Sequence, residues 1–254
     1  MSVDLAIVIS IFIFIITAMV LGVIFSGRKQ AEHEDELKRA ASARGWKLDI
    51  TNERGYRINR WTGNTEGISW TAESMMHRAG GNRRDRRRHI ARWHGQWNPG
   101  INAPIVAMGL PKGKEQLGTT IAEGDGFFAK MAQKAAGFAF DKAIDVYFGT
   151  EAGQQVDAGA MRRVEAATPG FIIMAAHKDE GARVLSQGFE RAIVDATNDK
   201  GSVLSDEDRP WILLRPNGIS LARMERYRTI EELDGFVKAG VAVTRAFKFG
   251  RPIS

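Results

Sequence analysis

Arginine is the residue type with the clearest chemical consequence in this 254-residue chain, because seven arginines fall between residues 78 and 94. That segment reads RAGGNRRDRRRHIARWH, and Asp85 is its one acidic residue. Guanidinium groups bind phosphates and carboxylates through paired hydrogen bonds. Seven arginines minus one aspartate equal the net charge of the whole chain, +6, so the basic character is local. We expect a basic patch that binds a partner or lipid, formed by Arg83, Arg84, Arg86, Arg87, Arg88 and Arg92.

The ligand of this basic patch is open to three interpretations. Arginine suits carboxylates on a protein partner, and basic side chains near a membrane attract anionic lipid headgroups. A solvated loop without any ligand is the second interpretation. Nucleic acid is the third and is disfavoured, because the rest of the chain is not basic and the nearby Trp93 is predicted to point inward from a strand.

Other chemical motifs are weak. GLPKGKEQ, residues 109–116, is one residue short of a phosphate-binding loop, and Glu115 stands where a Ser or Thr would reach magnesium. The five histidines form no HExxH pattern, and His89 and His94 lie five apart on a predicted strand, so they should face opposite ways. The chain has no cysteine and no GxSxG elbow. We therefore predict no catalytic, cofactor-binding or metal-binding residues.

The location of the basic patch depends on the start of the chain. Residues 5–25 read LAIVISIFIFIITAMVLGVIF, an uncharged run of 21 residues. A helix of this length covers roughly 30 Å, the thickness of the hydrocarbon core of a bilayer. A cleaved signal peptide would have a basic first segment and a shorter apolar run. The run therefore predicts a retained transmembrane anchor, residues 1–27.

Charges beside the anchor predict its orientation. Lys and Arg resist translocation, and Arg28, Lys29, Lys38 and Arg39 all follow the anchor while none precedes it. The N-terminus should lie outside and the C-terminal domain in the cytoplasm. Small residues recur every fourth position on one face of the anchor, where another helix could approach closely. These candidate contact residues are Ala18, Gly22 and Ser26.

The remainder predicts an α+β domain with an antiparallel sheet covered by helices. Residues 28–45 are rich in helix formers and end at Gly45, which predicts a polar helical stalk. From residue 46 onward, apolar and polar residues alternate in short runs separated by turn sequences, which predicts consecutive antiparallel strands. Apolar residues at helical spacing then follow in 125–148, after Asp179 and after Thr229. We divide the domain into a first half, 46–150, and a second half, 151–254, whose PWILLRPNGISLARM segment predicts a hairpin around Asn217 and Gly218.

These features favour a non-enzymatic, single-pass accessory, assembly or scaffolding subunit of a larger membrane protein complex. Its expected partners are the lipid bilayer, other membrane subunits and anionic headgroups, with nucleic acid unlikely. A membrane-tethered ligand-binding or sensory domain, or an enzyme of unknown reaction, is the alternative. Membrane-tethered nucleic-acid binding through the arginine patch is the third hypothesis.

Overall fold

A computed structural model describes most of the sheet and several helices of this chain. The described residues are 25, 28, 30–53, 55–77, 89–98, 100–110, 140–157, 159–164, 171–184, 209–224, 227 and 229–249. The chain divides into two compact units, Met1–Lys47 and Leu48–Ser254. Among the described residues, no helix has the length and apolar character needed to cross a bilayer. The predicted anchor lies outside them except for Phe25, and so do Ala18, Gly22 and Ser26.

The described part of the first unit contains a helix that covers residues 30–43. Its end confirms the predicted stop at Gly45, which has a φ of 71°. The Gly45 N–H donates to Ser42 O (2.9 Å) and the Trp46 N–H donates to Ala41 O (2.9 Å). These two bonds form a Schellman motif, which requires the left-handed backbone that glycine adopts without strain. Both Ala41 and Trp46 are buried, as is usual for the apolar contact in this motif.

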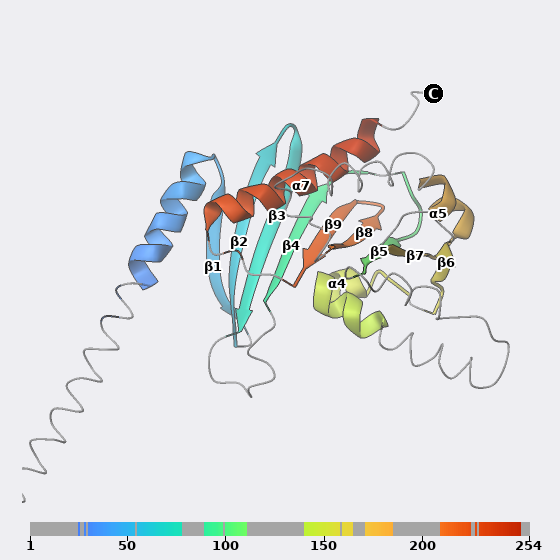
Figure 1. Cartoon of the computed structure of the whole chain (residues 1–254), viewed down its shortest axis with the longest axis horizontal. Helices are drawn as coiled ribbons and strands as arrows, with labels where there is room; N and C mark the ends of the chain where they lie inside the picture. The colour runs from blue at the N-terminus through green and yellow to red at the C-terminus, as the bar shows by residue number, and fades with distance from the viewer. Residues whose placement is uncertain are drawn as a thin grey trace, which may run out of the picture. The chain divides into compact units, whose positions relative to one another are not determined.

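A nine-stranded sheet forms the centre of the second unit (Figure 1), which confirms the predicted antiparallel sheet. The strands follow the order β1-β2-β3-β4-β9-β8-β5-β7-β6, so strands from both predicted halves contribute to one sheet. The strands are β1 Lys47–Glu53, β2 Tyr56–Thr65, β3 Ile68–His77, β4 Ile90–Gln96, β5 Ile105–Gly109, β6 Arg162–Val164, β7 Phe171–Ala175, β8 Trp211–Arg215 and β9 Gly218–Arg223. The short strand β6 was not predicted from the sequence, because three residues show no clear alternation.

Two hairpin turns illustrate different ways of reversing the chain. Glu66 and Gly67 join β2 to β3 and have φ values of 55° and 78°. Positive φ at both positions is typical of the type I′ turn that matches the strand twist. The predicted hairpin between β8 and β9 is also present, but Arg215 pairs with Gly218 and the turn is therefore Pro216–Asn217. Neither Asn217 nor Gly218 is among the positive-φ residues of the described chain.

Helix α7, Ile230–Phe249, covers one face of the sheet and contacts β4 and β9 (Figure 1). Thr229 and Glu232 form a capping box at its start. The Glu232 N–H donates to Thr229 Oγ1 (3.3 Å), and the Thr229 N–H donates to Glu232 Oε2 (3.4 Å). The predicted apolar stripe is confirmed, because several of its residues are almost fully buried: Leu233, Phe236, Val237, Val241 and Thr244.

The opposite face of the sheet packs against a second group of helical residues. Residues 140–148 are helical and α4 spans Thr150–Gly153. Helix α5, Lys178–Val184, instead contacts β6 and β7 on the α7 side of the sheet, because its Gly181 lies against Ala175 and Val164. Helix α5 begins one residue before Asp179, which lies in its first turn. Tyr147 stacks on Trp211 of β8, with ring centroids 4.3 Å apart. The buried members of this second core are Val106, Ile144, Phe148, Ala152, Val156, Met161, Leu213 and Ala222.

Candidate functional site

Polar side chains occupy two neighbouring rows across the face of the sheet opposite α7. Residues that pair directly across antiparallel strands project from the same face. One row runs from Arg60 through Glu73 and Arg92 to Ala222, and the next runs from Thr71 through His94 to Ser220. The alternate residues, such as Trp93, face α7. We call these two rows, together with Arg215 of β8, the polar face.

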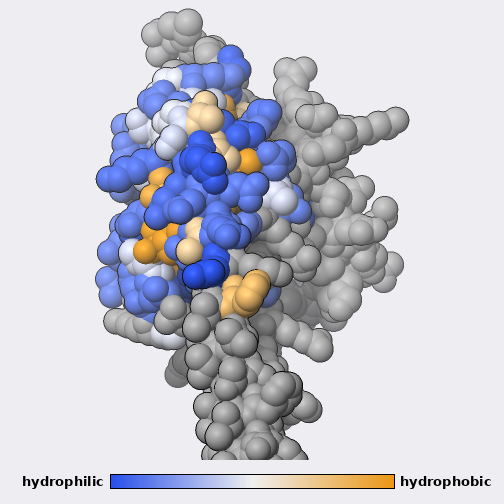
Figure 2. Space-filling view, turned by 90° about the vertical axis from the view of Figure 1, so that its left-hand side faces the viewer, coloured by the Kyte–Doolittle hydropathy of each residue, from blue (hydrophilic) through white to orange (hydrophobic). Residues whose placement is uncertain are grey.

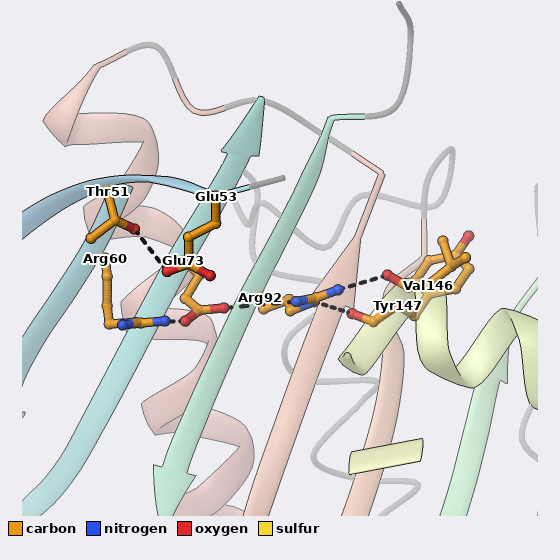
Figure 3. Close-up of polar contacts among 7 residues, drawn as sticks. All are labelled: Thr51, Glu53, Arg60, Glu73, Arg92, Val146 and Tyr147. Atoms are coloured by element: carbon orange, nitrogen blue, oxygen red, sulfur yellow. Dashed lines mark hydrogen bonds and ion pairs between the residues drawn. The ribbon is translucent and has the colours of Figure 1, made fainter. Parts of the chain in front are cut away.

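The first row is a connected set of charges (Figure 3). Arg60 Nε donates to Glu73 Oε1 at 2.7 Å, and Arg92 Nη1 lies 3.8 Å from Glu73 Oε2. The hydrogen bond to Glu73 raises the pKa of Arg60, and the Glu73 charge adds to the same effect. Burial lowers the pKa of Arg92, and Glu73 opposes that change. Glu73 is therefore the shared counter-charge of Arg60 and Arg92, which lie on the same face of the sheet.

Arg92 also closes the C-terminus of the helix at 140–148. Its Nε donates to Tyr147 O at 2.7 Å and its Nη2 donates to Val146 O at 2.9 Å (Figure 3). The last carbonyls of a helix carry partial negative charge and have no partner within the helix. Gly149 follows with a φ of 89°, and a Cβ there would lie 3.2 Å from Arg92 Nη1. Arg92 thus ties β4 to this helix.

The second row brings together three side chains from three strands. His94 Nδ1 lies 3.1 Å from Ser220 Oγ and 3.0 Å from Arg215 Nη2, and Arg215 Nη2 also donates to Ser220 Oγ at 3.2 Å. Arg215 Nη1 approaches Gln155 Oε1 at 3.4 Å. Since a guanidinium group can only donate, His94 Nδ1 must accept, and its proton must lie on Nε2. We call these residues the Arg215 cluster.

A serine hydroxyl beside a histidine is the contact used for nucleophilic catalysis, but this pair is poorly suited to it. Burial and the neighbouring Arg215 lower the pKa of His94 to about 4. A general base works best when its pKa lies near the operating pH. The Nδ1 lone pair also already accepts from Arg215. Ser220 is therefore not activated by His94 in this arrangement.

The depressed pKa of His94 predicts a pH-dependent stability. An unfolded histidine takes up a proton near pH 6.5, while folded His94 does so only near pH 4. The unfolded state therefore binds more protons between these values, and the free energy of unfolding should fall by up to about 3 kcal/mol as the pH drops through them. Urea unfolding of the wild type and of His94→Gln between pH 4 and 7 measures this. A difference between the two proteins that does not change with pH would contradict the prediction.

The described residues place only part of the site predicted from the sequence. Arg83, Arg84, Arg86, Arg87 and Arg88 lie outside the described residues, so their role in a patch stays a prediction. Arg92 is described, and its guanidinium group is engaged by the helix end and Glu73. The glycine-rich segment that follows β5 also lies outside the described residues. Within the described ranges, no three His, Cys, Asp or Glu side chains are grouped to hold a metal ion.

One feature of the sequence indicates the Arg215 cluster. Arg215 is the only charged residue of the apolar strand WILLR, and a charge in a buried strand needs partners. Its partners could not be identified, because His94 belongs to a strand more than 120 residues earlier.

No protein-family model, curated protein or solved structure matches the chain. A function must therefore be inferred from the residues themselves. Two features support such an inference: the apolar segment at the start of the chain and the polar face of the sheet.

Proposed function

We propose that the chain is a single-pass, membrane-anchored accessory, assembly or scaffolding subunit of a larger membrane protein complex. Its α+β domain acts on the cytoplasmic side. Residues 5–25 carry no charge, and four basic residues follow within the next fourteen positions, 26–39. Length and charge asymmetry of this kind are typical of a signal anchor whose C-terminal side stays in the cytoplasm.

The observation that carries the membrane part of the proposal is the uncharged run of residues 5–25. Within this run, the exposed Phe25 gives further support. It is the one described residue of the apolar segment, and it exposes 64% of its surface. Elsewhere in the described chain the large apolar side chains are covered, with Met224 as the other exposed one. A phenylalanine left in water loses the favourable free energy of burial, which lipid would restore.

The described residues on one side of the molecule fit a surface that faces water. The coloured residues in Figure 2 are mostly hydrophilic, and the hydrophobic ones among them form small separate groups. The helix at 30–43 exposes most of its side chains, including a Gln30 to Glu34 hydrogen bond of 3.1 Å. A polar helix of this kind supports the assignment of residues 28–45 as a stalk between the anchor and the folded domain.

Purification of the full-length chain from membranes in mild detergent tests the subunit role. We expect one or more membrane proteins to copurify at a constant ratio to the chain. Gly22→Leu should reduce that ratio, because it fills the small-residue face proposed to contact another helix. Val20→Leu adds bulk at a position predicted to lie on the other side of the anchor, and it should leave the ratio unchanged. A chain that always purifies alone would contradict the proposal and favour the tethered ligand-binding alternative.

A further inference from the structure

Arg215 is a buried charge whose partners are all neutral. The residue exposes only 9% of its surface. Its guanidinium group contacts His94, Ser220 and Gln155, and none of these side chains carries a negative charge in this arrangement. Burying a charged group without a counter-charge costs free energy, which proteins normally avoid by pairing it.

No described carboxylate forms a salt bridge with Arg215. Glu151 raises the pKa of Arg215 from a greater distance, but its own side chain is exposed and so is screened by water and salt. Burial lowers the pKa of Arg215 overall, yet a guanidinium group remains protonated in proteins. Its Nε is buried and has no hydrogen-bond partner. One donor and one positive charge are therefore left unsatisfied.

The guanidinium group is held in place by its neighbours. His94, Ser220 and Gln155 approach it from β4, from β9 and from the segment after α4. Because His94 is neutral, its Nδ1 accepts a hydrogen bond and does not repel Arg215. Gly218 leaves room for this ring, since a Cβ there would lie 2.5 Å from His94 Cε1. Fixing a guanidinium group before a ligand arrives lowers the entropy cost of binding.

We propose that the Arg215 cluster binds one small oxyanion of the phosphate class, which supplies the missing counter-charge and accepts from the Arg215 Nε–H. A hydrogen bond from a charged guanidinium donor to an oxyanion is stronger than one between neutral groups. The depth of Arg215 selects a free anion over a phospholipid headgroup, which is fixed to the membrane surface. This site is separate from the proposed role in a membrane complex and does not depend on it.

Calorimetric titration of the full-length protein in detergent micelles with inorganic phosphate tests the proposal, with sodium chloride at equal ionic strength as the reference. We expect saturable binding of one phosphate per chain. Arg215→Met should weaken binding at least about tenfold, the range of a lost charge-assisted hydrogen bond. Arg162→Met is the matched control, because Arg162 is exposed and donates to the backbone oxygens of Gly159 and Met161. It should bind phosphate like the wild type.

The basic patch could also attract phosphate, so a second variant separates the two sites. Replacement of Arg83, Arg84, Arg86, Arg87 and Arg88 by Ala should leave the one saturable phosphate intact. Loss of binding in this variant, together with normal binding by Arg215→Met, would overturn the proposal. Sedimentation with vesicles that contain phosphatidylserine tests the headgroup as source. An effect of Arg215→Met on vesicle binding without an effect on phosphate would also overturn it.

Folding effects can be distinguished from loss of the site. The His94 ring signals in NMR spectra should shift during the phosphate titration with the same dissociation constant as the heat. If Arg215→Met does not fold, Arg215→Lys provides the test, because it keeps the charge but loses the fixed Nε–H donor and should still bind at least several-fold more weakly. Absence of saturable phosphate binding by the wild type at millimolar concentrations would overturn the proposal without any variant.

Discussion

Gly240→Val is expected to lower the free energy of unfolding by roughly 4 kcal/mol, which is the largest effect predicted for this chain. Gly240 lies on the buried side of α7, where the helix crosses the indole ring of Trp93. A Cβ at this position would lie 2.3 Å from Trp93 Cδ2. The ring has no space on its other side, because a Cβ on Gly95 would lie 2.3 Å from Trp93 Cη2. Trp93 itself is completely buried, so it cannot move into solvent.

Urea unfolding followed by tryptophan fluorescence measures this effect. Lys238→Val is the matched control, since it places the same β-branched residue in the same helix at a side chain that is 73% exposed. It should cost less than about 1 kcal/mol. Trp93→Leu in the Gly240→Val background should recover part of the loss, because a smaller side chain leaves room for the valine. Equal stabilities of Gly240→Val and Lys238→Val would contradict the packing of α7 on β4.

Arg92→Met is expected to cost about 3 kcal/mol, the second largest effect. The substitution keeps the length of the side chain but removes both hydrogen bonds to the helix end at Val146 and Tyr147. It also removes one of the two arginines beside Glu73. Val146 and Tyr147 are half-buried, so their carbonyl groups pay a cost of desolvation when they lose their donors.

Arg60→Met is the matched control, because Arg60 contacts the same Glu73 carboxylate but is 39% exposed. It should cost less than about 1 kcal/mol, as is common for exposed ion pairs. Arg92→Lys should fall between the two, since an ammonium group can reach one carbonyl but cannot reproduce the paired donors. Chemical denaturation of the three variants gives the comparison. Equal costs for Arg60→Met and Arg92→Met would show that the helix cap contributes little.

Local structure was predictable from the sequence wherever a few adjacent residues determine it. Gly45 ends the helix at 30–43 as expected, because only the preceding turn and one left-handed residue are involved. Thr229 and Glu232 likewise satisfy each other's backbone N–H groups within one turn. The alternation around Trp70 and Trp93 correctly predicted strands, since the side-chain period of two is a property of the strand itself.

Pairings between distant strands could not be predicted in this way. Strand β9 pairs with β4, and β8 pairs with β5, so the hairpin from the second half of the chain separates two strands of the first half. No local pattern determines which edge a hairpin joins, because the choice depends on how all the apolar faces pack together. The polar face depends on these pairings, and His94, Ser220 and Arg215 meet only after β4, β9 and β8 have assembled.

The contacts of Arg92 likewise depend on strand pairing and could not be predicted from its local sequence. Its position in the sequence groups it with the five arginines at 83–88, which predicted a common binding patch. Strand pairing places it opposite Glu73 and Ala222, on a face that packs against the helix at 140–148, and its membership of the patch stays a prediction. Charge counts along the chain contain no information about which side of a strand a residue faces.

Protease treatment of sealed membrane vesicles of known orientation tests most directly whether the chain is anchored with its α+β domain in the cytoplasm. We expect the domain of the full-length protein to be digested only when the cytoplasmic surface faces the protease, and the apolar segment to remain in the membrane pellet. Digestion from the opposite surface, or recovery of the intact chain in the soluble fraction, would contradict the proposed anchor and the membrane complex built on it.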